Sequence, residues 1–317
     1  MELGYALSSE EHPPDELVRY AQRAEQAGFE FALISDHYHP WVDRQGQSPF
    51  VWCTIGGIAQ ATSRLRIGTG VTCPLMRIHP AIIAQAAATA AVMLPDRFFL
   101  GVGAGENLNE HVTGGKWPEP SIRLEMLEEA VEVIRLLWQG GKQSHRGRYY
   151  TVEEARIYTL PPQPPPLFIA ADGEKSAGLA GRTGDGLIGV APESELIDAF
   201  AAAGGRRKPR YGQVTVCYAG REAEARKIAH TWWPTSGLKG TLSWEIKTPT
   251  LFGQAVKSVR EEDVAESIIC GPDPKRHLEA IQKFIDAGYD HVYVHQVGPD
   301  QEGFFRFYTE SIIPVLT

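Results

Sequence analysis

Cysteine is scarce in this sequence. The 317 residues include only four, far apart at Cys53, Cys73, Cys217 and Cys270. No two have the close spacing of a structural zinc site, and a chain of this size does not need a disulfide framework. We therefore expect free, reduced thiols, as in a cytoplasmic protein.

Long apolar runs and an excess of basic residues are also absent. No run approaches the ~20 apolar residues that a membrane span needs, and the first residues show no basic and then apolar stretch typical of a signal peptide. The formal net charge is -8, and the pI is about 5.7. This balance disfavours nucleic acid and anionic membranes as partners. We expect a small-molecule substrate, with no nucleic acid and no membrane as partner.

What the sequence does contain is a regular alternation of short apolar runs and helical segments. It shows no repeat, low-complexity segment or linker, so we expect one domain over residues 1–317. Strands that are apolar on both faces are typical of parallel sheets covered by helices. Eight strand–helix units favour an α/β fold, a (β/α)8 TIM barrel, over an open doubly wound sheet. The predicted strands are 3–7, 31–35, 65–69, 97–102, 167–171, 186–189, 213–217 and 291–295.

Two insertions interrupt this alternation, after strands four and seven. A polar, glycine-rich loop over 103–120 follows strand four. Beyond the next helix, residues 140–165 are predicted to form a hairpin with arms at 149–152 and 157–158. Residues 221–260, which include three tryptophans, are predicted to be a helical excursion after strand seven.

Polar residues directly after the strands are the candidates for catalysis, because barrel enzymes place their active sites at the carboxyl ends of the strands. His37 follows strand two, and an imidazole can act as a general acid or base near neutral pH. Glu106 follows strand four beside two glycines, where the backbone can approach a ligand. Glu10 follows strand one and can complete a carboxylate pair across the barrel mouth. The alternatives stay open: a loop-capping role for His37, a solvated position for Glu106 and a helix-end role for Glu10.

A metal site is not expected, and the signals for phosphate binding are weak. Asp36 and His37 are adjacent and cannot easily reach one ion from a strand end, and no His-x-His or Glu-x-x-His spacing lies nearby. The glycines at 103–105 lack the further residues of dinucleotide-binding or P-loop signatures. The run Asp-Gly-Glu-Lys-Ser at 172–176 stands at the start of the fifth helix, where amide groups and Lys175 can hold a phosphate.

Several motifs follow one another in a specific order. Asp-His-x-x-Pro-Trp occupies 36–41, and Gly-x-Gly-Glu-x-Leu-Asn-Glu occupies 103–110. Between them lie Gly-Thr-Gly-Val-x-x-Pro at 68–74 and Pro-Ala-x-Ile-Ala-Gln at 80–85, and Ala-Gly-Arg-x-Gly-Asp-Gly follows at 180–186. Together they resemble the luciferase-like superfamily, and within it the F420-dependent oxidoreductases of the glucose-6-phosphate dehydrogenase-related family. The resemblance covers nearly the whole chain and is weakest over about 193–260.

The resemblance implies that the cofactor is coenzyme F420, an 8-hydroxy-5-deazaflavin, with FMN as the alternative. A deazaflavin exchanges hydride and reacts poorly with oxygen, which implies a dehydrogenase rather than a monooxygenase. The peptide bond between Gly70 and Val71 is implied to be cis and to lie against the ring. The family has glycine where this chain has Asp172. The implied cofactor-binding residues are Asp36, Gly70, Val71, Cys73, Ala104, Gly105 and Asn109 at the ring and ribityl chain, and Asp172, Gly173, Lys175 and Ser176 at the phosphate.

The resemblance also implies the catalytic residues. His37 removes a hydroxyl proton while hydride leaves the same carbon for C5 of the deazaflavin, and Glu106 is the proton partner on the N1 side of the ring. Trp41 supports the charge that develops near His37, and Glu10 orients or tunes it. The acid and base roles of His37 and Glu106 can be exchanged. Relatives often dimerise through one side of the barrel, which implies a homodimer.

The substrate is an alcohol or a sugar (phosphate) by this resemblance, but the expected phosphate clamp is missing. Family members that oxidise glucose 6-phosphate hold its phosphate with two lysines, an arginine and a threonine. The matching positions here are Val190, the 192–193 region, Gln254 and Ser267, and none is cationic. A phosphate without cations loses its charge-assisted hydrogen bonds. Lys239, Lys247 and Arg260 can substitute from the excursion, or Trp232, Trp233 and Trp244 can shape an apolar pocket. An FMN-dependent monooxygenase and a non-catalytic flavin-binding barrel are the alternative functions.

Overall fold

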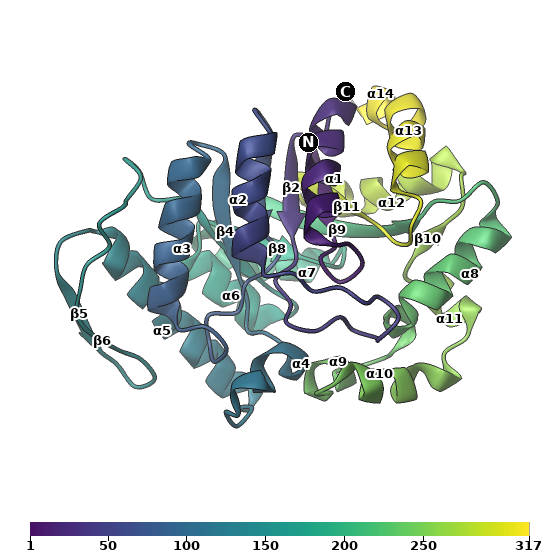
Figure 1. Cartoon of the computed structure of the whole chain (residues 1–317). Helices are drawn as coiled ribbons and strands as arrows, with labels where there is room; N and C mark the ends of the chain where they lie inside the picture. The colour runs from purple at the N-terminus through teal and green to yellow at the C-terminus, as the bar shows by residue number, and fades with distance from the viewer. Residues whose placement is uncertain (317) are drawn as a thin grey trace.

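The computed structural model describes residues 1–316 and contains a closed barrel of parallel strands (Figure 1). Within these residues, β11 pairs with β1 and β9 pairs with β8, so the eight barrel strands form a complete ring. The (β/α)8 barrel and all eight strands predicted from the sequence are confirmed, with small changes in their ends. The strands are β1 (Glu2–Leu7), β2 (Phe31–Ile34), β3 (Arg66–Thr69), β4 (Phe98–Val102), β7 (Leu167–Ala170), β8 (Gly186–Gly189), β9 (Arg210–Cys217) and β11 (His291–Gln296).

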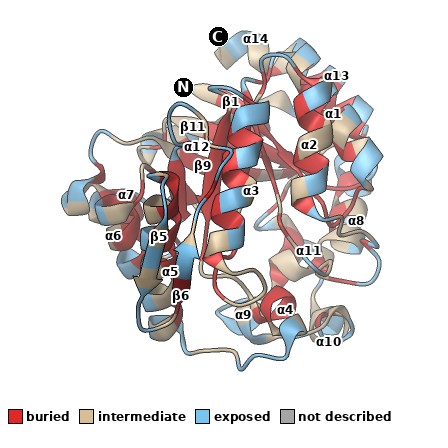
Figure 2. Ribbon diagram, turned by 60° about the vertical axis from the view of Figure 1, so that its left-hand side comes forward, coloured by how far each residue is buried: buried red, intermediate tan, exposed pale blue. Residues whose placement is uncertain are grey.

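Helices cover the outside of the barrel (Figures 1 and 2). Four of those in the described part of the chain begin with a proline in the first turn, where its missing N–H costs no helical hydrogen bond. These are α1 (Pro14–Ala27), α3 (Pro80–Met93), α5 (Pro120–Trp138) and α12 (Pro274–Asp286). The sequence analysis assigns no element to α12. The other outer helices are α2 (Val51–Ala61), α6 (Glu174–Thr183), α7 (Ser194–Phe200), α13 (Gln301–Ser311) and α14 (Ile313–Leu316).

The segment after β9 is helical, as predicted, and it lies against the loop after β4. The predicted loop over 103–120 is not irregular throughout: it contains α4 (Asn107–Glu110) and a turn of 3-10 helix, His111–Thr113. The Asn107 side chain donates a hydrogen bond to the backbone oxygen of Glu245. The two insertions therefore meet at one end of the barrel. The helices of the later one are α8 (Glu222–Trp232), α9 (Leu242–Glu245), α10 (Pro249–Ala255) and α11 (Glu261–Ala265).

The hairpin after α5 is present, but its predicted arms were wrong. The paired strands are β5 (Gln143–Arg146) and β6 (Thr151–Ala155), two antiparallel neighbours. The carboxylate of Glu129 on α5 accepts the backbone N–H groups of Arg148, Tyr149 and Tyr150. Those residues are thereby held as the turn and cannot form a strand arm. The side chains of the two tyrosines make other contacts: the Tyr149 hydroxyl donates to Glu125 of α5, and the Tyr150 ring meets the His79 ring edge to face.

Large rings fill the amino end of the barrel. Phe31, Phe99, Phe168 and Tyr211 each stand at or next to the first residue of their strand, and all are buried. Glycines on neighbouring strands make room for them. A Cβ at Gly68, for example, would lie 1.9 Å from the Phe99 ring, its registered partner in the sheet. Because this end is plugged, the open space of the barrel lies at its carboxyl end, where barrel enzymes place their active sites.

Candidate active site

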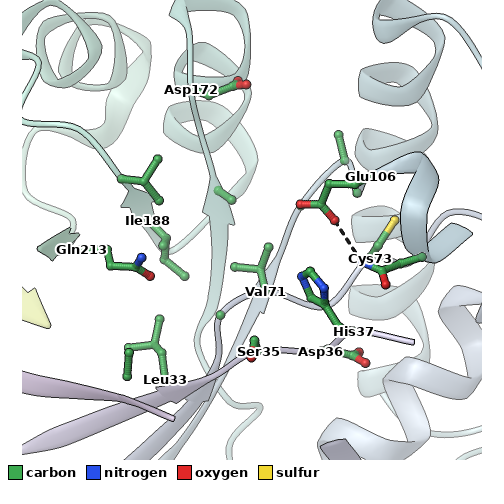
Figure 3. Close-up of a pocket in the computed structure, with 18 of the residues that line it drawn as sticks. Leu33, Ser35, Asp36, His37, Val71, Cys73, Glu106, Asp172, Ile188 and Gln213 are labelled. Atoms are coloured by element: carbon green, nitrogen blue, oxygen red, sulfur yellow. Dashed lines mark hydrogen bonds between the residues drawn. The ribbon is translucent and has the colours of Figure 1, made fainter. Parts of the chain in front are cut away.

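The carboxyl ends of the strands surround a cavity of about 320 Å³. Figure 3 shows part of its lining, with side chains from the loops after β2, β3, β4 and β7 pointing inward. Of the residues named as site candidates from the sequence, Gly173 and Lys175 lie outside the lining. The candidates that line it are Glu10, Asp36, His37, Trp41, Gly70, Val71, Cys73, Ala104, Gly105, Glu106, Asn109, Asp172 and Ser176.

His37 lies beside Glu10 at one wall of the cavity. Its Nε2 atom is 3.4 Å from Glu10 Oε1, and its Nδ1 atom is 3.2 Å from the backbone oxygen of His39. The His37 and Trp41 ring centroids are 5.2 Å apart. With Nδ1–H donated to the His39 carbonyl, Nε2 is free to take a proton from a bound hydroxyl group. The Glu10 carboxylate then stabilises the resulting imidazolium.

Glu10 is held as a carboxylate although it is buried. Ser35 Oγ donates a hydrogen bond to its Oε2 atom at 2.7 Å, and Ser8 Oγ donates another at 3.1 Å. Burial on its own raises the pKa of Glu10, but the charge of His37 and the Ser35 hydrogen bond more than offset this, and the pKa lies below its ordinary value. The site therefore keeps a fixed negative charge next to the His37 ring.

Arg77, which the sequence analysis did not single out, joins two buried carboxylates. Its Nη2 atom donates to Asp36 Oδ1 at 2.9 Å, and its Nε atom lies 3.5 Å from Glu110 Oε1. Asp36 also accepts a hydrogen bond from Thr72 Oγ1 at 2.7 Å. Burial opposes the charge of Arg77, but Asp36 more than offsets it, so the pKa of Arg77 is raised. The pKa of Glu110 is raised by its burial. The cluster fastens the loops after β2, β3 and β4 to one another.

Asn109 connects the loop of His37 with the loop of Glu106. Its Nδ2 atom donates to Glu106 Oε2 at 3.3 Å, the hydrogen bond drawn in Figure 3. Its Oδ1 atom accepts the backbone N–H groups of Tyr38 and His39 at 2.9 and 3.2 Å. The two candidate acid–base residues thus stand on segments whose relative position is fixed by one amide side chain.

Small residues form the floor of the cavity between these loops. The Gly70–Val71 peptide bond is cis, as the family resemblance implies. Gly105 has a φ of 71°, and a Cβ there would lie 2.5 Å from Cys73 Sγ. A Cβ at Gly103 would lie 2.7 Å from Val71 Cγ2. Only glycine fits at positions 103 and 105, and this leaves an uncrowded surface that suits the face of a planar ring. Burial raises the pKa of the Cys73 thiol, so it stays uncharged there.

The amino end of α6 forms a separate corner of the site. Ser176 Oγ accepts the backbone N–H groups of Asp172 and Gly173, both at 3.2 Å, and lies 3.0 Å from Asp172 Oδ1. A Cβ at Gly173 would meet no heavy atom within 4 Å. This open space stands against the first turn of a helix, where N–H groups can bind an anion. The side chains of Asp172 and Lys175 are both exposed beside it.

Several lining residues were missed by the sequence analysis. Gln213 of β9 and both Tyr293 and His295 of β11 line the cavity, and His295 is 5% exposed. The signal was available, because His295 is at the carboxyl end of strand eight, the end of the barrel at which His37 also lies. Of the three tryptophans that the sequence offered for an apolar pocket, Trp233 and Trp244 do line the cavity, from the excursion after β9, and Trp232 does not.

Cations are absent from the cavity wall: no lysine or arginine among residues 1–316 lines it. Lys239 forms an ion pair with Glu266, and Arg260 forms one with Asp263. Lys247 is exposed and outside the lining, as are Gln254 and Ser267. Val190 does line the cavity, but it is apolar. The excursion thus supplies no substitute for the missing phosphate clamp.

Among the described residues 1–316, no group of three or more His, Cys, Asp or Glu side chains has a geometry that could hold a metal ion. In the same part of the chain, no helix combines the length and the apolar character needed to cross a membrane.

Comparison with known proteins places this geometry in a family. A family model described as luciferase-like monooxygenase matches residues 1–291. An F420-dependent hydroxymycolic acid dehydrogenase of Mycobacterium tuberculosis is 38% identical, over 99% of this chain and 88% of that protein. An F420-dependent glucose-6-phosphate dehydrogenase of Microbacterium testaceum is 36% identical, over 100% of this chain and 97% of that protein.

A solved structure is similar along its whole length. It is an F420-dependent secondary alcohol dehydrogenase in complex with an F420-acetone adduct, with a TM-score of 0.92 and 31% identity, covering 99% of this chain and 98% of that one. An F420-dependent tetrahydromethanopterin reductase from Methanopyrus kandleri, 21% identical with a TM-score of 0.81, shows the same fold. The chain belongs to the luciferase-like family, and within it to the F420-dependent dehydrogenases.

Proposed function

We propose that this protein is an F420-dependent oxidoreductase that moves a hydride between the deazaflavin and the hydroxyl-bearing carbon of an alcohol or uncharged sugar. The observation that carries the proposal is the cavity itself. It sets a carboxylate-supported histidine, His37, against a floor of glycines that can receive a planar ring. The curated relatives named above and the more similar of the two solved structures named above are F420-dependent dehydrogenases, which disfavours an FMN-dependent monooxygenase. A bare binding barrel would need neither His37 nor Glu106.

The cavity fits the cofactor at two places. The floor made by Gly70, Val71, Cys73, Ala104 and Gly105 would receive the ring, with Asp36 and Asn109 at its rim. The open space at Gly173, where a Cβ would meet nothing, leaves room for a phosphate against the start of α6. Ser176, Lys175 and the N–H groups of that turn would hold it, with Asp172 beside them. When bound, the deazaflavin supplies a carbon that accepts or returns hydride.

The protein's own residues supply the proton chemistry. We assign His37 as the base in alcohol oxidation, because Nε2 has no hydrogen-bonded partner within residues 1–316 and Glu10 stands ready to stabilise the protonated ring. Trp41 packs against the same ring and limits water around it. Glu106, held by Asn109, is the proton partner on the other side of the site. Returning an aldehyde or ketone to an alcohol uses the same groups in reverse.

The wall of the cavity selects against sugar phosphates. A phosphate needs charge-assisted hydrogen bonds to leave water, and the lining offers carboxylates and aromatic rings instead of lysine or arginine. Trp41, Trp233 and Trp244 supply flat apolar surface around the reacting carbon. The substrate is therefore an uncharged alcohol or sugar.

The proposal is tested by cofactor titration followed by turnover. We expect the protein to bind F420 more tightly than FMN, and to bleach the absorbance of oxidised F420 when a panel of uncharged secondary alcohols and sugars is added. Glucose 6-phosphate serves as the charged comparison and should react more slowly. Tight FMN binding with substrate-dependent oxygen uptake would contradict the proposal.

Removal of the Asp172 carboxylate is expected to tighten F420 binding. Asp172 places a negative charge at the corner where the phosphate would lie. Asp172→Asn keeps the oxygen that faces Ser176 Oγ but removes the charge, so the Kd should fall by about two- to tenfold at low salt and by less at high salt. Glu195→Gln is the matched control, since Glu195 is an exposed carboxylate in the first turn of α7, away from the cavity. An unchanged or higher Kd for Asp172→Asn would argue against a phosphate at this corner.

A homodimer and a cytoplasmic location complete the proposal. Exposed apolar side chains stand at both ends of α3, Ile82 in its first turn and Val92 and Met93 in its last, and a second copy could cover them. The four cysteines are free, which fits a reducing compartment. A single-chain mass in light scattering would exclude the dimer.

A further inference from the structure

Two consecutive glutamates each face a histidine at the edge of the cavity. Both follow β1, which lies between β2 and β11 in the barrel. Glu10 turns to one side and meets His37, which follows β2. Glu11 turns to the other side, where its Oε2 atom lies 3.5 Å from Nε2 of His295 on β11. The His37 half of this arrangement belongs to the proposed reaction, whereas the His295 half has no role in it so far.

The His295 half contains unmet hydrogen-bonding groups although it is buried. His295 is 5% exposed, and the Glu11 side chain is 1% exposed. His295 Nε2 and Glu11 Oε2 face each other at 3.5 Å without forming a hydrogen bond, and Trp233 Nε1 has no hydrogen bond within residues 1–316. Within residues 1–316, Nδ1 of His295 forms no hydrogen bond either. The Trp233 and His295 rings meet edge to face at 4.7 Å, and both residues line the cavity. Buried polar groups nearly always have partners in folded proteins, so the unpartnered Nδ1 atom of His295, on a side chain that lines the cavity, points to a bound molecule.

A purely structural histidine in the same chain looks different. His277 is fully buried, its Nδ1 atom is 3.0 Å from the Tyr308 hydroxyl, and its Nε2 atom is 2.9 Å from the Gly271 carbonyl oxygen. Neither His277 nor its partners line the cavity. His295 is also buried but has no such hydrogen bonds, and it lines the substrate cavity.

The surroundings define the chemistry of the missing partner. Glu10, Glu11 and His12 are the nearest titratable groups in the chain segment after β1, His37 stands beyond Glu10, and no lysine or arginine lines the cavity. An anionic group would be repelled, so the partner is neutral. A hydroxyl group is neutral and can donate a hydrogen bond to an imidazole nitrogen. Adjacent strands lie ~4.8 Å apart, so the ends of β2 and β11 are roughly 10 Å apart across β1. The side chains of His37 and His295 extend from these two strand ends toward the same cavity. They can therefore contact two substrate groups that are only a few bonds apart.

We propose that His295, held by Glu11, binds a second hydroxyl group of the substrate, next to the carbon that loses hydride, so that vicinal diols and uncharged sugars are preferred over simple alcohols. The inference rests on the proposed function, since it describes the substrate of the same site. His295 is then a specificity-determining residue. Trp233 supplies the apolar wall beside it.

The matched substrates for the test are propylene glycol and isopropanol, which differ only in the neighbouring hydroxyl group. With F420 at saturation, the wild-type protein should show a kcat/KM for the diol about 10- to 100-fold above that for isopropanol, the range expected for a site built to hydrogen-bond a hydroxyl group. His295→Leu should bring this ratio to about one. A ratio is used because it cancels any general loss of activity. His230→Leu is the control, because His230 is on α8 and outside the lining, and it should keep the wild-type ratio.

Two conservative variants identify the atom that contacts the substrate. His295→Asn keeps a polar atom near the position of Nδ1, and His295→Gln keeps one near Nε2, which faces Glu11. We expect the asparagine variant to retain more of the diol preference than the glutamine variant. A wild-type ratio near one overturns the inference even if no variant folds, and so does a preserved ratio in His295→Leu. If F420 is bound but reduced by no alcohol or sugar at all, the proposed function itself has failed, and the inference falls with it.

Discussion

His37→Ala is expected to lower kcat by about 100- to 10,000-fold, the range in which a positioned general base contributes. F420 binding should stay within about threefold of the wild-type value, since the ring is proposed to rest on the floor formed by Gly70, Val71 and Gly105 rather than on His37. Without the imidazole, the hydroxyl proton must leave to water, and the Glu10 carboxylate is left with no cation to stabilise. The loss should therefore appear in kcat at saturating cofactor.

The measurement is F420 reduction under single-turnover and steady-state conditions, with the Kd for F420 taken from fluorescence quenching. His39→Ala is the matched control: it lies two residues away, its ring is 3.0 Å from the Leu108 carbonyl oxygen, and it does not line the cavity. It should retain near-normal turnover. Near-normal turnover in His37→Ala would remove His37 from the mechanism and leave Glu106 as the candidate base.

Glu10→Gln tests the effect of the Glu10 charge separately from that of the His37 imidazole. The pKa of Glu10 lies below its ordinary value because of His37 and Ser35, despite burial, so the side chain is ionised throughout the neutral range. The amide variant keeps the hydrogen bond from Ser35 but loses the negative charge beside the imidazole. We expect a smaller loss of kcat than in His37→Ala, with the ascending limb of the pH–rate profile moved toward lower pH, because the imidazolium is less stable and gives up its proton earlier.

The barrel was predictable because its signal is local and repeated. Each strand is a short apolar run, each is followed by a helix, and the chain repeats this pattern through all the barrel strands of residues 1–316. The strand-end rule located His37, Glu106 and Glu10, and the cavity brings all three together. The same rule reaches His295, but a histidine inside an apolar run was assigned to the strand and not to the site.

What the sequence could not supply depends on contacts between distant segments. The hairpin arms shifted because Glu129, about 20 positions earlier in the chain, accepts the N–H groups of the turn. Arg77 was not predicted as a site residue because it does not directly follow a strand. Its importance comes from Asp36 and Glu110, which approach it only after three loops have folded over the barrel. The spacing of residues within one segment therefore cannot predict the cluster of Arg77 with Asp36 and Glu110.

Arg77→Leu is accordingly expected to cost about 3–5 kcal/mol of folding free energy, the usual penalty for leaving buried charges without their partner. Asp36 and Glu110 are 0% exposed in their side chains, and the Arg77 side chain is 6% exposed. The leucine fills part of the volume but leaves two carboxylates in a region with little water. F420 binding should also weaken, because Asp36 is among the proposed contacts of the ring. Urea unfolding followed by tryptophan fluorescence measures the stability loss.

The pH dependence of that loss distinguishes unpaired charge from lost packing. Burial already raises the pKa of Glu110, and Arg77 opposes this rise, so removal of Arg77 raises the pKa of Glu110 further. A group whose pKa is higher in the folded state than in the unfolded state binds its proton more tightly when folded, so its cost is absent below the unfolded pKa and grows as pH rises toward the folded one. The deficit of Arg77→Leu should therefore be smaller near about pH 5 than near about pH 8. Arg97→Leu is the control, since Arg97 donates only to Thr62 and to the Leu65 carbonyl, which do not titrate. Its deficit should not change with pH, and an equally flat deficit for Arg77→Leu would mean that the two carboxylates do not depend on Arg77 for their charge.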